Sequence, residues 1–149
     1  MLRDDINNAL KAAMKAGEAR RVSTLRLVNA AILQRETGGA ERVTLSDAEI
    51  LDVMAKMIKQ RQESLEIYEK AGRADLAAQE REEIEIIAAY LPKRMSDLDA
   101  AEAISALIKE IEAETLKDMG RTMAALKQRF SGRMDFAKAG ALVKKLLAG

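Results

Sequence analysis

The chain has 149 residues, a third of them charged, with a formal net charge of +1 and neither cysteine nor histidine. The length suits one domain or two small ones. The two missing residue types exclude disulfides, thiolate chemistry, Ser-His-Asp and Cys-His catalytic sites and the usual zinc sites, so we do not expect a self-sufficient enzyme.

Helix-forming residues dominate the composition, which includes only two Tyr, two Phe and one Pro. Ala, Leu, Glu, Lys, Arg and Met lose the least free energy on entering a helix, so we expect an all-α protein. The sequence contains no phosphate-binding loop and no dinucleotide-binding glycine motif. We therefore expect no cofactor, and the lack of histidine and cysteine predicts no metal.

No apolar run reaches the roughly 18 residues that a membrane helix needs. The first residues, Met1-Leu2-Arg3-Asp4-Asp5, are too acidic for a secretion signal. The sequence thus predicts a cytoplasmic protein with no membrane partner.

Two amphipathic helices are predicted in the first 40 residues. Hydrophobic residues recur every four positions over 2–16, and Gly17 can end that helix in a left-handed conformation. A second pattern predicts a helix over 19–36, which Gly38 and Gly39 interrupt.

A capping signature opens the longest predicted helix. Ser46 and Glu49 have the spacing at which each side chain accepts a hydrogen bond from the backbone of the other. The helix that follows is expected to end near Gly72, and a fourth helix is predicted over 73–90.

Two charges fall inside the apolar faces of these two helices. Arg61 lies in the hydrophobic stripe of the third helix, and Glu80 lies in the apolar arc of the fourth. Because an unpaired charge that faces a core is costly, we hypothesise that Arg61 and Glu80 form an ion pair where the two helices pack. The alternative is that both side chains extend to the solvent edge.

The only proline, Pro92, marks the predicted boundary between two units. Before it the chain has 14 basic and 16 acidic residues, and after it 11 basic and 8 acidic residues. We expect an N-terminal helical domain of about four helices over 1–92 and a small C-terminal domain of three helices over 93–149.

Three short helices are predicted after the proline. Ser96 is a good N-cap for the first, Thr115 with Asp118 resembles a weaker capping pair for the second, and Asp135 can cap the third. Gly140 lies inside the last helix, where glycine costs about 1 kcal/mol relative to alanine. We therefore expect a close helix crossing that leaves no room for a side chain at Gly140.

The positive charge is concentrated at the end of the chain. From Leu116 onward, eight basic residues are opposed only by Asp118 and Asp135, so this 34-residue segment has a net charge of +6. Such a surface can neutralise phosphates, and we predict a nucleic-acid-binding site there. The alternative is the ordinary solvated face of soluble helices. With four aromatic residues in the chain, any RNA would be recognised through its backbone and shape and not by base stacking. The candidate residues are Lys117, Arg121, Lys127, Arg129, Arg133, Lys138, Lys144 and Lys145.

Three ordered stretches resemble the GatB/YqeY family, and together they cover essentially the whole chain. The triplet Tyr90-Leu91-Pro92 stands between two helical blocks, as the resemblance requires. The stretches are Ala19-Arg20-Arg21-Val22-Ser23-Thr24-Leu25-Arg26-Leu27-Val28, the run from Ile58 through Tyr68-Glu69-Lys70-Ala71-Gly72-Arg73 to Pro92, and Lys117-Asp118-Met119-Gly120-Arg121-Thr122-Met123.

The resemblance implies a stand-alone YqeY-like protein, similar to the helical and tail region of the GatB subunit of the glutamine-dependent aminoacyl-tRNA amidotransferase. That enzyme amidates Glu or Asp already attached to tRNA. Its helical and tail region is associated with holding tRNA, whereas glutamine hydrolysis belongs to another subunit. The resemblance further implies that Lys117, Gly120, Arg121 and Arg133 face RNA, while Lys138 lies in a less regular stretch.

We therefore expect a non-catalytic tRNA-binding or accessory role linked to glutamine-dependent tRNA amidation, with tRNA and another protein subunit or enzyme as partners. Two other interpretations stay open. One is carbon-nitrogen ligase activity with glutamine as the amido donor. The other is a protein-interaction module that docks through an apolar patch containing Met119, Met123, Met134 and Leu142.

Overall fold

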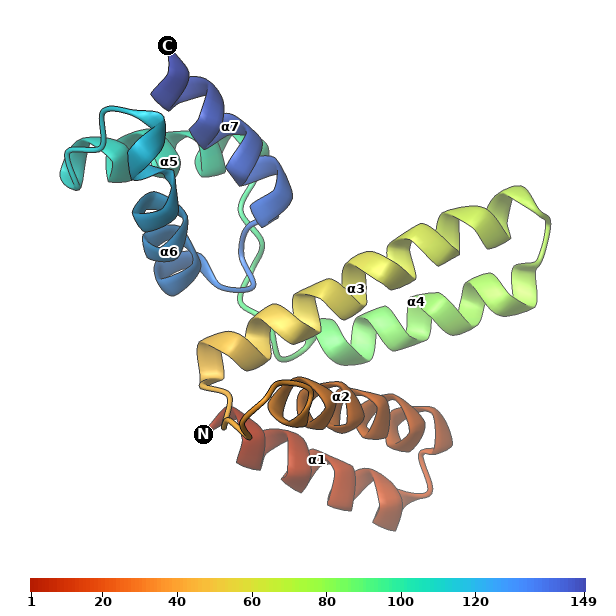
Figure 1. The fold of residues 1–149 in the computed structure, drawn as a ribbon. Helices are drawn as coiled ribbons and strands as arrows, with labels where there is room; N and C mark the ends of the chain where they lie inside the picture. The colour runs from red at the N-terminus through yellow and green to blue at the C-terminus, as the bar shows by residue number, and fades with distance from the viewer. The chain divides into compact units, whose positions relative to one another are not determined.

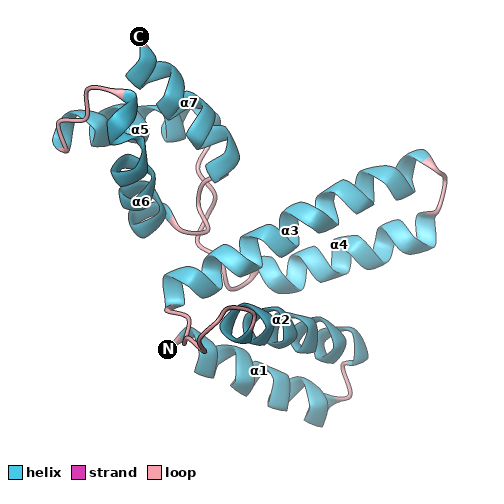
Figure 2. Ribbon diagram, viewed as in Figure 1, coloured by secondary structure: helices cyan, strands magenta, loops and turns pink.

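The computed structural model describes all of residues 1–149, and its only regular elements are helices (Figure 2). The predicted all-α class is confirmed. None of the helices combines the length and the hydropathy that a membrane crossing requires. In chain order the elements are α1 (Leu2–Ala16), α2 (Ala19–Thr37), α3 (Asp47–Lys70), α4 (Ala74–Ala88), α5 (Asp97–Glu110), the 3-10 helix η1 (Leu116–Asp118), α6 (Met119–Phe130) and α7 (Phe136–Ala148) (Figure 1).

The chain forms two compact units, Met1–Leu91 and Pro92–Gly149, which we call the N-terminal unit and the C-terminal unit. Each unit has its own hydrophobic core. In the N-terminal unit, α1 and α2 form one antiparallel pair and α3 and α4 form a second (Figure 1). The fully buried side chains of that unit include Ile6, Leu25, Ile32, Met54 and Ile87.

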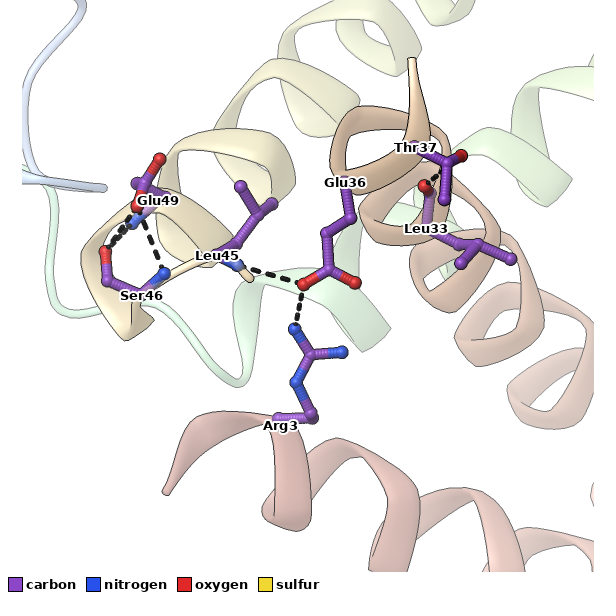
Figure 3. A network of polar contacts seen from close by, with 7 residues as sticks. All are labelled: Arg3, Leu33, Glu36, Thr37, Leu45, Ser46 and Glu49. Carbon is purple, nitrogen blue, oxygen red and sulfur yellow. Dashed lines mark hydrogen bonds and ion pairs between the residues drawn. The ribbon is translucent and has the colours of Figure 1, made fainter. Parts of the chain in front are cut away.

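A buried carboxylate fixes the loop between α2 and α3. Glu36 accepts a hydrogen bond from the backbone N–H of Leu45 at 2.9 Å and forms an ion pair with Arg3 of α1 (Figure 3). The Leu45 N–H bond, followed by the Arg3 guanidinium, lowers the pKa of Glu36 against the opposing effect of burial. The loop that leads into α3 is therefore fastened to both helices of the first pair.

The predicted capping box at the start of α3 is confirmed. The Ser46 hydroxyl accepts from the Glu49 N–H at 3.2 Å, and the Glu49 carboxylate accepts from the Ser46 N–H at 3.1 Å (Figure 3). Two backbone donors that have no partner inside the helix are thereby satisfied.

Three helices end in a left-handed turn of the same kind. Gly17 after α1 and Gly72 after α3 have φ angles of 69° and 72°. After α5 the same position is held by Glu112 with φ 55°, while the next N–H, that of Ala113, donates to the Ile108 carbonyl at 3.0 Å. A left-handed conformation is costly for a residue with a Cβ atom, so the end of α5 needs additional support.

Arg61 forms an ion pair, but its partner is Glu83 and not the predicted Glu80. The Arg61 Nε lies 2.9 Å from Glu83 Oε2, with side-chain exposures of 14% and 8%. The Met57 carbonyl accepts from Arg61 at 3.2 Å, and Gln79 donates to the second oxygen of Glu83 at 3.2 Å. Glu80 and Glu83 lie on one side of α4 because they are three residues apart, and it is the buried Glu83 that reaches the guanidinium.

Thr24 in α2 is fully buried, and its hydroxyl has no hydrogen-bond partner. An unsatisfied buried hydroxyl costs about 1–3 kcal/mol. We expect Thr24→Val, which places a methyl group where the hydroxyl stands, to raise the free energy of unfolding of the N-terminal unit by about 1 kcal/mol. Urea unfolding followed by tyrosine fluorescence measures this unit selectively, because both tyrosines, Tyr68 and Tyr90, lie in it.

The control for this prediction is Thr24→Ser, which keeps the hydroxyl and removes a buried methyl group, and which we expect to be destabilising. A Thr24→Val protein that is less stable than the native protein would contradict the prediction.

The C-terminal unit packs α5, α6 and α7 around Ile104, Leu107, Leu126 and Val143. Gly140 of α7 faces Met119 and Met123 of α6, and an added Cβ would lie 3.7 Å from the Met123 Cε. This is ordinary van der Waals contact with the end of a flexible side chain. The expectation that Gly140 leaves no room for a side chain is therefore wrong.

Candidate nucleic-acid interface

The eight candidate cations of the terminal segment divide by residue type in the structure. All four arginines of the C-terminal unit make contacts within the unit, whereas none of its seven lysine side chains forms a hydrogen bond or an ion pair. The two groups therefore have different consequences for function.

Arg121 supports the left-handed turn that ends α5. Its guanidinium donates to the carbonyls of Ile111 at 2.7 Å and Glu112 at 3.3 Å, and its Nε lies 3.1 Å from the Asp118 carboxylate. These bonds satisfy carbonyls that the helix leaves without a partner and hold the turn at Glu112. Arg121, predicted to face RNA, is therefore committed to the fold by three acceptors.

Asp118 is the counterpart of Arg121 in this arrangement. Its carboxylate accepts from the N–H groups of Glu114 at 2.8 Å and Thr115 at 3.1 Å. These two bonds, together with Arg121, lower the pKa of Asp118 to about 2 from its usual value of 3.8. The ionised carboxylate therefore stabilises the unit above about pH 4, and this contribution is lost as the pH falls through 2.

The two other candidate arginines are also engaged. Arg129 makes two bonds to the Glu110 carboxylate of α5, one of them at 3.0 Å, and this contact lowers the pKa of Glu110. Arg133 donates to the Lys93 carbonyl at 3.3 Å, while its own carbonyl accepts from the Met95 N–H at 2.8 Å. Arg133 thus attaches the segment after Pro92 to the rest of the C-terminal unit.

Unlike the arginines, the lysines of the terminal segment make no hydrogen bonds or ion pairs within the unit. They are all exposed to solvent. The only two carboxylates of this segment are engaged, Asp118 as described and Asp135 as the N-cap of α7, where it accepts from the Ala137 N–H at 2.9 Å. Arg121 and Arg129 are exposed as well but are paired with carboxylates, so the exposed cations without an internal partner are Lys117, Lys127, Lys138, Lys144 and Lys145.

One face of α6, together with the short helix η1 before it, combines lysines with small residues. Gly120, Ala124 and Lys127 follow at intervals of four and three residues, so they share one side of α6, and Lys117 of η1 precedes Gly120 by three residues. All four are exposed. Gly120 has a helical backbone, and a Cβ added to it would meet nothing within 4 Å. The fold therefore gives no reason for glycine at this position.

The aromatic residues offer no platform for bases in this unit. Phe130 and Phe136 are partly buried and pack against its core, and the two tyrosines lie in the N-terminal unit. The surface around the lysines is thus suited to phosphate contacts and not to base stacking.

The apolar residues that were predicted to form a docking patch for a protein partner mostly pack against the core of the C-terminal unit. Met134 is buried, and Met119, Met123 and Leu142 pack partly buried against the core of the C-terminal unit. The exposed leucines of this unit lie elsewhere, at Leu98, Leu116 and Leu146.

Sequence reasoning missed the structural role of Arg121. Its carbonyl partners lie nine and ten residues earlier in the chain, and no glycine marks the turn between them. One feature of the sequence could have indicated this role: Arg121 is a basic residue three positions after Asp118 and close in the chain to the end of the preceding helix.

These features define a small helical protein of two units whose C-terminal unit has a lysine-rich surface. The chain belongs to the YqeY-like protein family, whose model matches residues 3–147. The family predicted from the sequence is confirmed.

Curated relatives are known from yeasts. "Altered inheritance of mitochondria protein 41, mitochondrial" of Lachancea thermotolerans is 32% identical over 110 residues, covering 72% of this chain and 58% of the relative. Its namesake in Eremothecium gossypii is 33% identical over 82 residues, covering 55% and 44%. An uncharacterized protein of Schizosaccharomyces pombe is 29% identical over 93 residues, covering 62% and 74%. The chain thus spans about half the length of the first two relatives.

The predicted cytoplasmic location is wrong. Four relatives, including those of L. thermotolerans and E. gossypii, are mitochondrial by name, and this finding contradicts the prediction.

Proposed function

We propose that this protein binds tRNA through the exposed lysines of its C-terminal unit and serves as a non-catalytic accessory of glutamine-dependent tRNA amidation. The observation that carries the proposal is the separation of the cations: the arginines hold the unit together, and the lysines are left for an external anion. Lysine presents a mobile point charge, which suits phosphates of variable geometry.

The net positive charge of the terminal segment favours a polyanionic ligand. The segment from Leu116 onward has eight basic residues and two acidic ones, and both carboxylates are already bound within the unit. Binding of phosphates to the lysines releases counterions from the nucleic acid, which favours association at low salt.

The face of α6 supports close contact with the ligand. The small residues Gly120 and Ala124 lie between Lys117 and Lys127, so a sugar-phosphate backbone can approach the helix while a lysine contacts it on either side. Recognition of this kind depends on phosphates and shape, as in the binding of helical RNA.

The link to amidation is supported by the resemblance to the helical and tail region of the GatB subunit of the amidotransferase. Membership of the YqeY-like family agrees with that resemblance. A role beside a larger enzyme also suits a chain without histidine or cysteine.

The direct test is the affinity of the purified protein for tRNA as a function of salt. With about four lysine contacts, the logarithm of the association constant falls with a slope of about −3 to −4 against the logarithm of the salt concentration. Between 50 and 200 mM salt we therefore expect a loss of affinity of about a hundredfold. Fluorescence anisotropy with labelled tRNA measures this, and an affinity that does not depend on salt would overturn the proposal.

The link to amidation has its own test. Added to a glutamine-dependent amidotransferase at limiting misacylated tRNA, the protein is expected to raise the rate of amide formation. An unchanged rate beside salt-dependent tRNA binding would remove the link and leave the binding function in place.

Two glycines of the C-terminal unit provide a matched pair of variants. We expect Gly120→Ala and Gly140→Ala each to stabilise the unit by about 1 kcal/mol, because both positions are helical and accept a Cβ. Only Gly120→Ala is expected to weaken tRNA binding, by about two- to fivefold, since Gly120 is exposed on the lysine-bearing side of α6, whereas Gly140 faces Met119 and Met123. Thermal unfolding and anisotropy measure the two effects, and equal tRNA binding by both variants would exclude a contact at Gly120.

A further inference from the structure

The face formed by η1 and α6 carries an uncharged polar group beside its lysines. Gly120, Ala124 and Gln128 are exposed and follow at intervals of four residues, so they form one ridge along α6. Lys127 lies beside this ridge, three residues after Ala124, and Lys117 of η1 precedes the ridge. The Gln128 amide makes no hydrogen bond within the protein. This face therefore presents two free cations, two small residues and one free amide.

The C-terminal unit lacks what single-stranded RNA needs for tight binding. Proteins that bind single strands stack the bases on exposed aromatic side chains. Phe130 and Phe136 are the only aromatic residues of this unit, and both pack partly buried against its core. A duplex keeps its bases stacked on one another and is bound through its phosphates and sugars. The surface thus suits a duplex better than a single strand.

The small residues fit one of the two grooves of helical RNA. The major groove is deep and narrow and excludes side chains, whereas the minor groove is wide, shallow and lined by 2′-hydroxyl groups. A helix approaches a shallow groove closely only where its own side chains are short, as at Gly120 and Ala124. Lys117 and Lys127 are ten residues apart, about 15 Å along the chain direction, which suits phosphates on the two strands that border a groove.

Gln128 can distinguish RNA from DNA. An amide both donates and accepts hydrogen bonds, and so does the 2′-hydroxyl group, which DNA lacks. Helix α7 also has exposed lysines, at Lys138, Lys144 and Lys145, but it contains no uncharged polar side chain. Of these two helices, only α6 combines positive charge with a group that can bind the ribose.

We propose that the face of η1 and α6 lies in the minor groove of double-helical RNA, as in a stem of tRNA. Lys117 and Lys127 contact phosphates of the two strands, Gly120 and Ala124 face the sugars, and the Gln128 amide hydrogen-bonds a 2′-hydroxyl group. This inference rests on the proposed binding of tRNA and names the part of the RNA that is recognised. Gln128 is the residue that determines the preference for RNA over DNA.

Three labelled probes test the class of ligand with the full-length protein. They are an RNA duplex of about 12 base pairs, a DNA duplex of the same sequence and an unstructured single-stranded RNA of the same length. In fluorescence anisotropy at one salt concentration, we expect the RNA duplex to bind at least about tenfold more tightly than either of the others. Attraction by charge alone predicts nearly equal binding of the two duplexes. Equal binding of the duplexes, or tighter binding of the single strand, would overturn the inference.

Labelled tRNA measured in parallel separates this inference from the proposed function. Salt-dependent binding of tRNA without a preference for the RNA duplex overturns the minor-groove assignment and leaves the proposed function in place. Failure to bind tRNA overturns both.

Substitution of Gln128 tests the contact with the ribose. We expect Gln128→Leu, which keeps the length of the side chain and removes the amide, to weaken the RNA duplex by about three- to fivefold and to leave the DNA duplex unchanged. Gln62→Leu is the matched control, because Gln62 is an exposed glutamine of the N-terminal unit, and it is expected to change neither affinity. An equal loss for RNA and DNA with Gln128→Leu would contradict the assigned role.

Two exposed alanines locate the duplex on the unit. Ala124→Leu is expected to weaken the RNA duplex by about fivefold or more, because the larger side chain keeps the helix away from the groove. Ala141→Leu is the matched control, since Ala141 is exposed among the lysines of α7, and it is expected to have little effect. Circular dichroism during thermal unfolding checks that both variants fold. A larger loss with Ala141→Leu than with Ala124→Leu would place the RNA on α7 and contradict the assignment.

Discussion

We expect the triple substitution Lys117→Glu, Lys127→Glu and Lys145→Glu to lower the affinity for tRNA by about a hundredfold or more at 50 mM salt. Each lysine is exposed and free of internal contacts, so the change removes phosphate contacts and adds repulsion without breaking a bond in the fold. The slope of affinity against salt is expected to become shallower by about 0.9 for each lysine–phosphate pair that the substitutions remove. Anisotropy titrations at several salt concentrations measure both quantities.

A matched control changes the net charge equally at the other unit. Lys11, Lys15 and Lys70 are exposed lysines of the N-terminal unit without ion pairs, and their reversal to glutamate is expected to weaken tRNA binding much less. An equal loss with both triple variants would show that total charge, and not the lysine face of the C-terminal unit, determines the affinity.

The largest loss of stability is expected from Glu83→Ala. This change leaves the Arg61 guanidinium, which is 14% exposed, with the Met57 carbonyl as its remaining partner. Removing one member of a buried ion pair costs about 3–5 kcal/mol, and because Arg61 keeps some access to solvent we expect about 3 kcal/mol. Urea unfolding followed by tyrosine fluorescence measures the effect in the N-terminal unit.

Two variants test the physical reason for this loss. Glu80→Ala, three residues earlier on α4, is expected to cost less than about 1 kcal/mol. Burial and the neighbouring Glu83 charge raise the pKa of Glu80, so the ionised group is already unfavourable there. The double variant Arg61→Leu with Glu83→Leu is expected to be more stable than Glu83→Ala alone, because it buries no unpaired charge. A double variant that is as unstable as Glu83→Ala would mean that the ion pair itself supplies the stability.

The helices were predictable because their signals are local. Ser46 and Glu49 are three residues apart and form the predicted capping box, and Gly17 and Gly72 take up the left-handed conformation that glycine allows. Such features depend on a few consecutive residues, so the order of residues is enough to predict them.

Partners across helices were less predictable because they depend on packing. Helical periodicity places Glu80 and Glu83 on the same side of α4, and it says nothing about how far α4 is shifted along α3. That shift decides which carboxylate meets Arg61. The space for a side chain at Gly140 was not predictable for the same reason, because it depends on where the ends of the Met119 and Met123 side chains lie.

The sequence was enough to predict the candidate site as a positively charged segment. It was not enough to predict that the arginines make contacts within the unit while the lysines do not. Positive charge is visible in the sequence, whereas the use of Arg121 to hold the carbonyls of Ile111 and Glu112 follows from a left-handed turn without a glycine. The lysines were part of the prediction, and the structure distinguishes them from the arginines by their lack of internal partners.

This division between arginine and lysine makes binding and stability chemically separable in the C-terminal unit. Acetylation removes the charge of a lysine and does not react with a guanidinium, so an acetylating reagent reaches Lys117, Lys127 and Lys145 while the bonds of Arg121, Arg129 and Arg133 stay intact. A protein treated in this way would keep its fold and lose its attraction for a polyanion.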